Sequence, residues 1–501
     1  MQASIVTTST SLKKKNSAFS VVLFIELWER FGYYGMQSIL ALFLSQHMKF
    51  SDYNANLLIA AFGTMTYAAP ALGGWIGDKV LGNQRAMLYG SIILALGYLL
   101  LASAMHYTGG IYITMAIIST GNGLFKPNAA TLVRRIYEEN DSQLDIAFTL
   151  YYMAVNVGST ISMLLCPYLK DNYGWDAAFI ACFVGLLLGI INYFITRKKL
   201  TPYVSPKDHS AISTSILSLI FVGILLCSTL ITVILMFPTI AQWCISAAII
   251  LILFLWIQMY LKIDPSYRAG LRIVYLLTLE GMLYFVFYQQ MSTSLTFFAL
   301  RNVDLSFPIG SYHLFNWSAG QFQALNPIWI MILSPLLAKL YATLGNKQKD
   351  FSIATKFVSG FFFVGIGFFI WWITCLYTHT PYISSWIMVA GYFFLSLGEL
   401  LTSGLGLAVI ARYVPASMNG FMTGSYFMAS GISLYIGGKI ANIAAPPNMN
   451  TLSADKTLII YQGLFFNLFC LAAVALVILI LFLPLLHKWD KKYKQDMLTV
   501  K

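Results

Sequence analysis

The sequence has few charged residues. Asp, Glu, Lys and Arg make up only 10% of its 501 residues, whereas about 25% is usual in a soluble domain. Hydrophobic residues make up 58% of the chain, and its mean hydropathy is +0.72. A chain with so little charge cannot cover its surface with polar groups in water. A soluble domain is therefore excluded, and lipid is the expected solvent.

Cysteine and histidine are also scarce. The six cysteines fall in or beside apolar stretches without a CxxC pair, and the six histidines are scattered. We interpret the cysteines as small buried hydrophobic residues rather than as disulfides or metal ligands. A membrane enzyme should show a nucleophile–base pair or a metal cluster, and a channel should show a filter loop. Neither pattern is found in the sequence, and both classes are disfavoured.

Positive charge is in excess, with a net charge of +12. The basic residues lie in short loops between apolar stretches, which is the pattern of the positive-inside rule and not of nucleic-acid binding. If the N-terminus is cytoplasmic, 24 of the 31 Lys and Arg fall on the cytoplasmic side, four fall on the outer side and three lie within spans. This bias predicts that both termini are cytoplasmic and that the number of spans is even.

The apolar stretches predict an all-α polytopic membrane protein with fourteen spans. The run from Phe19 to about Gln46 follows three lysines but is too long for a signal peptide, so we expect a retained first span. The expected spans lie near 19–46, 55–77, 84–104, 109–132, 144–168, 175–196, 212–234, 238–262, 269–300, 321–344, 352–377, 382–412, 416–443 and 456–486.

Two loops repeat one another and predict two related halves. Leu81–Arg85 reads LGNQR, and Leu344–Gln348 reads LGNKQ. If these loops correspond, two six-helix halves flank an inserted hairpin, as in the major facilitator superfamily. The expected divisions are an N-terminal six-helix bundle at 1–200, an inserted transmembrane hairpin with linkers at 201–266, and a C-terminal six-helix bundle with a basic tail at 267–501.

The first of these loops, Gly74–Arg85, resembles the glycine-rich cytoplasmic motif of that superfamily. Its glycines would permit close helix approach, and Asp78 could cap a helix or form a pair across the bundle. We therefore consider Asp78 and Arg85 as gating residues. An ordinary tight loop is the alternative.

Ionisable residues inside the spans are the strongest functional signal. Each costs about 2.5–3.5 kcal/mol at the bilayer centre, so its presence indicates a functional site. The candidates are Glu26, Glu29, Arg30, Lys126, Glu280 and Glu399.

One face of the first span holds three of these charges. At about 100° per residue the face gathers Glu26, Glu29, Arg30, Tyr33 and Gln37, with Tyr34 at its margin. Such a face must line a wet cavity or pair with other helices. The alternative is an ion-paired cluster with a purely structural role.

Several motifs resemble those of the proton-dependent oligopeptide transporter family. Glu26–Gly35 reads ELWERFGYYG and resembles the family's ExxER signature, and Phe148–Gly158 is similar to its FYxxINxG signature. Lys126 stands where the family has a lysine in its fourth helix, and Glu399 and Ser403 match its tenth-core-helix motif. The inserted hairpin is typical of bacterial members, and the chain looks most similar to bacterial di- and tripeptide permeases.

The resemblance implies a proton-coupled symporter for di- and tripeptides. It implies that Arg30 and Lys126 bind the peptide carboxylate and that Glu399 binds the amine, with proton coupling through Glu26, Glu29 and Arg30. Asn156 and Asn326 would bind the peptide backbone. The other expected contacts are Tyr33, Tyr34, Tyr67, Tyr152 and Ser403, although ordinary packing is an equal alternative for each tyrosine.

The sequence departs from the family at one expected gate. Many members place a basic residue two turns after the motif arginine and pair it with an acid in the first helix of the second half. Here these positions are Gln37 and Gln289, so a neutral contact would replace the charged one. Glu280, about 13 Å earlier along its helix, is a candidate inner-gate residue. Pairing with cytoplasmic-side basic groups is its alternative role.

These features predict a multi-pass protein of the bacterial cytoplasmic (inner) membrane that acts as a monomer. Its partners would be small peptides and the lipid bilayer, not nucleic acid. No cofactor is expected beyond the proton as coupling ion. The rival interpretation is a major facilitator transporter of another small solute, such as nitrate, a sugar or an amino acid.

Overall fold

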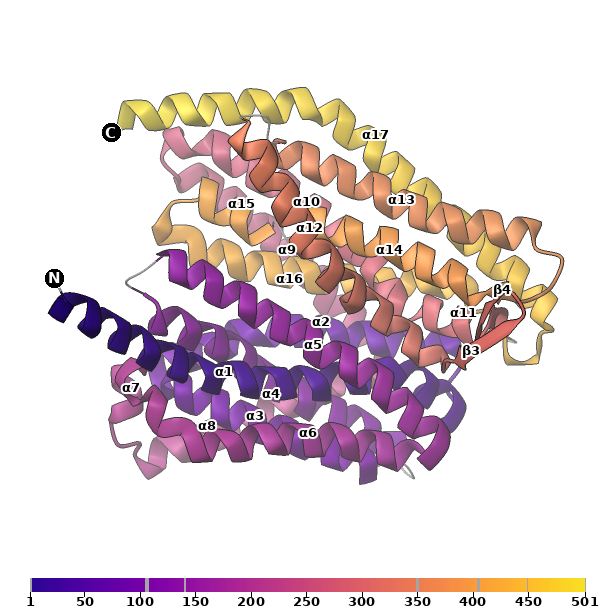
Figure 1. Cartoon of the computed structure of the whole chain (residues 1–501), viewed down its shortest axis with the longest axis horizontal. Coiled ribbons are helices and arrows are strands. Elements are labelled where there is room, and N and C mark those ends of the chain that lie inside the picture. The colour runs from indigo at the N-terminus through magenta and orange to yellow at the C-terminus, as the bar shows by residue number, and fades with distance from the viewer. Residues whose placement is uncertain are drawn as a thin grey trace. The chain divides into compact units, whose positions relative to one another are not determined.

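The computed structural model is mostly helical (Figure 1). It describes residues 2–103, 108–138, 141–347, 351–402, 406–447 and 449–500. Ser403, one of the expected site residues, lies outside these ranges.

The chain forms two compact units. The first comprises Met1–Phe43 and Met65–Phe237, and the second comprises Leu44–Thr64 and Pro238–Lys501. Helix α2 begins in the second unit and ends in the first.

The regular elements described up to residue 236 are all helical. They are α1 (Gln2–Leu42), a π-helix (Phe43–His47), α2 (Asp52–Ile76), a π-helix (Gly77–Leu81), α3 (Asn83–Ser103), α4 (Thr108–Ile136), α5 (Asp141–Tyr173), α6 (Trp175–Thr196), a 3-10 helix (Arg197–Tyr203), α7 (Pro206–His209) and α8 (Thr214–Met236).

The remaining helices belong to the second unit. They are α9 (Pro238–Lys262), α10 (Arg268–Gln289), α11 (Ser294–Asn302), α12 (Leu325–Asn346), α13 (Ile353–Tyr377), α14 (Ser385–Leu401), α15 (Gly406–Tyr413), α16 (Ala416–Ala441) and α17 (Ala454–Val500). Short 3-10 helices cover Pro265–Tyr267, Gln290–Ser292, Ala319–Ala324, Asn442–Ala444 and Met449–Thr451.

Ten helical segments within the described residues are long and apolar enough to cross a membrane. Two of them, α8 and α9, occupy the region where the sequence predicts the inserted hairpin. A multi-span membrane protein is the coarser conclusion that these segments support. The count of fourteen spans stays a prediction.

Two predicted spans are not continuous helices. The span expected near 269–300 breaks at Gln290–Ser292, between α10 and α11. Polar side chains compensate for the break, because Gln290 Nε2 donates to the carbonyls of Val286 and Gly437 at 3.0 Å. A break inside a membrane is tolerated when such contacts satisfy the backbone. Within the span expected near 382–412, α14 ends at Leu401 and α15 begins at Gly406, and residues 403–405 lie outside the described residues.

Four short strands accompany the helices of the second unit. They are β1 (Val303–Asp304), β2 (Ser306–Ile309), β3 (Tyr312–Asn316) and β4 (Ile383–Ser384). β2 and β3 form an antiparallel hairpin, while β1 pairs in parallel with β4. The sequence analysis predicted no strand: β1, β2 and β3 fall between the spans expected near 269–300 and 321–344, and β4 falls at the start of the span expected near 382–412.

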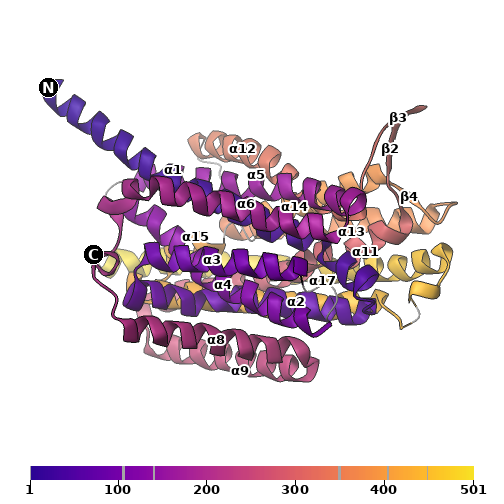
Figure 2. The ribbon, with the colours of Figure 1, turned by 90° about the horizontal axis from the view of Figure 1, so that it is seen from below.

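Small residues bring helices into close contact in the first unit, where α1 lies against α5 and α6, and α3 against α4 (Figures 1 and 2). Gly158 of α5 faces the Leu27 carbonyl of α1, and Gly90 of α3 faces the Gly121 carbonyl of α4. A side chain at either glycine would collide with backbone. Helices in lipid associate through such small-residue contacts, since lipid tails give them no hydrophobic drive to pack.

Candidate functional site

Glu26, Glu29 and Arg30 form one buried ionic cluster on α1. The Arg30 Nε lies 2.9 Å from Glu26 Oε1 and 2.8 Å from Glu29 Oε2. The three residues are at most 3% exposed. The predicted face of the first span therefore carries paired charges, which rules out a lipid-facing orientation for it.

The hydrogen-bonding capacity of this ionic cluster is only partly used. Arg30 Nη2 and Glu26 Oε2 are buried, and neither has a hydrogen-bond partner within the described residues. A guanidinium offers donors in a planar fork that suits a carboxylate. The Arg30 side chain thus has unused capacity to bind an anion.

Helix α4 adds two residues to this environment. Asn122 Nδ2 donates to Glu29 Oε1 at 3.1 Å. The sequence analysis missed Asn122, although its place one turn before Lys126 could have indicated it. Lys126 Nζ lies 4.8 Å from the centroid of the Tyr67 ring on α2, a cation–π contact.

The expected tyrosines and Asn156 lie on the same unit. The rings of Tyr33 and Tyr34 meet edge to face at 5.3 Å, and the Arg30 guanidinium lies 6.0 Å from the Tyr33 ring centroid. Asn156 donates to the Tyr152 carbonyl one turn earlier on α5. Asn156 is thus engaged within its own helix, while Tyr152 is exposed.

Glu399 and Asn326 come together in the second unit. Glu399 Oε2 accepts hydrogen bonds from Asn326 Nδ2 at 2.8 Å and from Tyr284 Oη at 3.2 Å. Asn326 Nδ2 also donates to Ser396 Oγ at 3.1 Å. Helices α10, α12 and α14 therefore meet at this carboxylate. The sequence predicted Glu399 and Asn326 but missed Tyr284, which stands four residues after Glu280.

Glu280 is buried on α10 at 5% exposure. Neither of its carboxylate oxygens has a hydrogen-bond partner within the described residues. The ion pair with basic groups that was its alternative role is not seen there. An unpartnered carboxyl at this depth is costly as an anion.

Each of the two glutamines at the expected outer gate has one buried polar atom without a hydrogen-bond partner among the described residues. These atoms are Gln37 Oε1 and Gln289 Nε2. Gln289 packs closely against the backbone of α16 at Gly437. Their gating role stays a prediction.

The glycine-rich loop connects α2, α4 and α7. Asp78 Oδ1 accepts a hydrogen bond from Asn83 Nδ2 at 2.9 Å. The same nitrogen donates to Asn128 Oδ1 of α4, also at 2.9 Å. Arg85 donates to the Lys207 and Ser210 carbonyls at 3.1 and 2.8 Å. Asp78 thus forms a local contact, whereas Arg85 anchors the segment before α8.

A second buried ion pair was not predicted. Arg301 at the end of α11 binds Asp52 at the start of α2 in a bidentate manner, at 2.7 and 3.0 Å. Arg301 also donates to Tyr461 Oη and Asn450 Oδ1. The sequence analysis counted Arg301 only as a residue of an outer segment. Opposite charges at the ends of two spans that meet on one side could have indicated the pair.

No group of three or more His, Cys, Asp or Glu side chains among the described residues could hold a metal ion. The notable charges instead lie within apolar helices. Glu280 is in one of the ten candidate spans, Glu26, Glu29 and Arg30 are in α1, and Glu399 is in the shorter apolar helix α14. Helices of this kind with compensated charges in their interior define a polytopic membrane transporter.

Comparison with known proteins identifies the family. The model of the POT family matches residues 84–458. The dipeptide and tripeptide permease A of Proteus mirabilis (strain HI4320) is 38% identical over 476 residues, covering 95% of this chain and 96% of that protein. The permease of the same name from Escherichia coli (strain K12) is 38% identical over 494 residues, covering 98% and 97%. The chain belongs to the POT family, whose members are transporters and not enzymes.

Solved structures agree with this assignment. A bacterial homologue of the human drug peptide transporters PepT1 and PepT2 superposes with a TM-score of 0.85 at 45% identity, covering 95% of this chain and 99% of that one. Tetrameric PepTSo2 superposes with a TM-score of 0.86 at 42% identity, with the same coverage. Since that neighbour is tetrameric, the expected monomer stays a prediction.

Proposed function

We propose that this protein imports di- and tripeptides together with protons, across the bacterial cytoplasmic membrane and with both termini in the cytoplasm. Relatives that match nearly the whole chain are named dipeptide and tripeptide permeases. The polar groups inside the two units suit the two charged ends of a peptide. A transporter that carries peptides of varied sequence should bind the termini and the backbone, because every peptide has them.

The observation that carries the proposal is the half-satisfied guanidinium of Arg30. Two carboxylates share its Nε, while its Nη2 is buried without a partner in the described residues. Together with Lys126, the cluster of Glu26, Glu29 and Arg30 has two acids and two bases, so its formal charges balance. One added proton leaves a net positive charge, which matches one peptide carboxylate.

The second unit offers the complementary group. Glu399 accepts hydrogen bonds from the neutral donors Asn326 and Tyr284. A carboxylate held in this way keeps its negative charge available for an ammonium group. We assign the peptide amine to Glu399 and the backbone amides to Asn326 and Asn156.

Protonation then couples to substrate through competition. A proton on Glu29 or Glu26 weakens its attraction to Arg30, and the peptide carboxylate takes the vacated place. Loss of the proton toward the cytoplasm restores both ion pairs and expels the peptide. The proton is the coupling ion, and no other cofactor takes part.

The carboxylate assignment is tested with Lys126→Ala in proteoliposomes. We expect binding of free-acid dipeptides to fall about tenfold or more, the loss of one charge-assisted hydrogen bond. C-terminally amidated dipeptides should change little. Lys494→Ala, at an exposed pair with Asp490, serves as the control. Equal losses for both peptide types would remove Lys126 from this role, and a preference for nitrate or free amino acids over peptides would favour the rival transporter class.

A further inference from the structure

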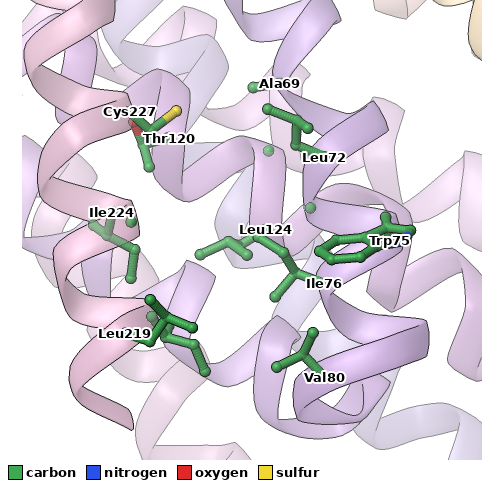
Figure 3. A pocket seen from close by; sticks show the side chains of 14 residues that line it. Ala69, Leu72, Trp75, Ile76, Val80, Thr120, Leu124, Leu219, Ile224 and Cys227 are labelled. Atoms are coloured by element: carbon green, nitrogen blue, oxygen red, sulfur yellow. The ribbon is translucent and has the colours of Figure 1, made fainter. Parts of the chain in front are cut away.

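An apolar groove of about 350 Å³ lies beside α8 in the first unit (Figure 3). Its walls come from α2 with the π-helix that follows it, from α4 and from α8. The side chains that define it include Leu72, Trp75, Thr120, Leu124, Leu219 and Ile224. None of the residues assigned to peptides or protons lines it.

The groove opens where hydrocarbon is expected. Both α2 and α8 belong to segments long and apolar enough to span a membrane. At the rim, Leu72 is 62% and Trp75 is 59% exposed. Thr120, Cys227 and the Trp75 indole contribute the only polar side-chain atoms of the lining. Water has almost nothing to bind in such a space.

Polar contacts hold α8 in place on either side of the groove. Toward its C-terminal end, Ser228 Oγ lies 3.1 Å from Thr120 Oγ1 of α4. Before its N-terminus, Asp208 of α7 accepts from the backbone N–H of Arg85 at 3.1 Å, and the Arg85 side chain donates back to two carbonyls of this segment. The groove lies between these two attachments, so α8 cannot easily move inward to close it.

The opposite wall is equally fixed. Gly73 of α2 packs directly against the backbone of Gly123 on α4, and Gly123 faces Ala69 in turn. Since these helices already touch backbone to backbone, α2 and α4 cannot move closer together to close the space. The backbone packing of these helices therefore fixes the wall of the groove, and a small shift of α2 would not close it.

We propose that an acyl chain of a bilayer phospholipid occupies this groove and packs between α8 on one side and α2 and α4 on the other. Apolar cavities of roughly 150 Å³ stay dry and take up apolar molecules such as benzene, and this groove is larger and open to the bilayer. The chain would fill the space that neither α8 nor α2 can close. The groove shares no residue with the proposed peptide site, so the lipid proposal can be tested independently of the proposed function.

Photolabelling tests the occupant. The full-length protein is reconstituted in vesicles containing phosphatidylcholine with a diazirine on its acyl chain, irradiated, and mapped by mass spectrometry. We expect several-fold more adducts on Leu72, Trp75 and Leu219 than on the exposed apolar residues Ile459 and Leu481 of α17. Equal labelling of both surfaces would overturn the proposal, as would cross-links between two copies of the chain at groove residues.

A filled groove provides the matched variant. An added Cβ at Gly223 of α8, which lines the groove, meets no described atom within 4 Å, and the same holds for Gly463 of α17. Gly223→Leu should lower groove labelling several-fold, while Gly463→Leu should leave it unchanged. Unaltered labelling in Gly223→Leu would contradict the proposal. If that variant fails to fold, the wild-type labelling pattern decides alone.

Discussion

The carboxylates of the two units are stabilised in different ways. In the first unit, Glu26 and Glu29 share the Nε of Arg30 in a buried ionic cluster. In the second, Glu399 accepts hydrogen bonds from an amide and a phenol, and Glu280 has no hydrogen-bond partner within the described residues. Glutamates of the two units thus differ in their partners: a guanidinium for Glu26 and Glu29, neutral donors for Glu399, and no hydrogen-bond donor among the described residues for Glu280.

This difference separates two tasks. An acid that shares a cation changes the availability of that cation when it binds a proton, which suits coupling. An acid that accepts hydrogen bonds from neutral donors, as Glu399 does from Asn326 and Tyr284, can also attract a substrate cation. This difference underlies our proposal that the first unit couples the proton and the second binds the peptide amine.

The strongest way to break the comparison is to neutralise an acid of the ionic cluster. Glu29→Gln should abolish peptide accumulation driven by an inward proton gradient, because the side chain can no longer exchange a proton. Counterflow of labelled against unlabelled dipeptide should persist, since the substrate contacts remain. Both are measured in proteoliposomes. Accumulation at the wild-type level would remove Glu29 from the coupling role.

The Asp52–Arg301 pair shows that ionic stabilisation is not confined to the first unit. Asp52→Asn should cost up to about 3 kcal/mol, because it leaves the partly buried Arg301 guanidinium without its counter-charge. Thermal unfolding in detergent measures the loss.

Two further variants check this explanation. Adding Arg301→Gln to Asp52→Asn should recover much of the stability, because no charge is then left unpaired. Lys494→Ala, which removes an exposed pair with Asp490, should cost no more than about 1 kcal/mol. A similar small effect for Asp52→Asn would show that the Asp52–Arg301 pair contributes little.

A variant of Glu399 tests the amine-binding role proposed for the second unit. Glu399→Gln should weaken binding of peptides with a free amine by about tenfold to a hundredfold, the range of one charge-assisted hydrogen bond. N-acetylated peptides, which carry no ammonium, should bind the variant and the wild type alike. Competition uptake distinguishes the two, and a uniform loss for both peptide classes would argue against the amine assignment.

Glu280 should respond least. Glu280→Gln replaces a carboxyl that has no partner within the described residues, so it removes no hydrogen bond and should shift the melting temperature by about 2 °C or less. Glu29→Gln in the same assay should lower it further. A large fall for Glu280→Gln would reveal a partner that forms in another conformation, as an inner gate requires.

Much of the fold followed from composition and spacing. Long apolar stretches predicted a helical membrane protein, since a span needs about 20 apolar residues whatever its neighbours are. The break at Gln290–Ser292 was not predicted, because its polar residues lie within a longer stretch that is apolar enough to be taken for one span. The side chain of Gln290 donates to the carbonyls of Val286 and Gly437 at this break, and Gly437 is 147 residues away along the chain.

The candidate site was predicted unevenly for a related reason. Glu26, Glu29 and Arg30 lie on one helix, so their spacing alone placed them on one face. Asn122 and Tyr284 were missed because polar and aromatic residues are common in these helices and carry no charge. Their partners, Glu29 and Glu399, are on other helices and become neighbours only in the folded chain.

The sequence by itself determined that the chain spans a membrane, which family it resembles, and which charges must be kept from lipid. A charge at membrane depth is costly in any fold, so its presence alone is informative. Only the tertiary structure decided which charges are paired, because Asp52 and Arg301 are far apart along the chain. The groove beside α8 is likewise a tertiary feature, since three helices and two distant polar contacts are needed to hold it open.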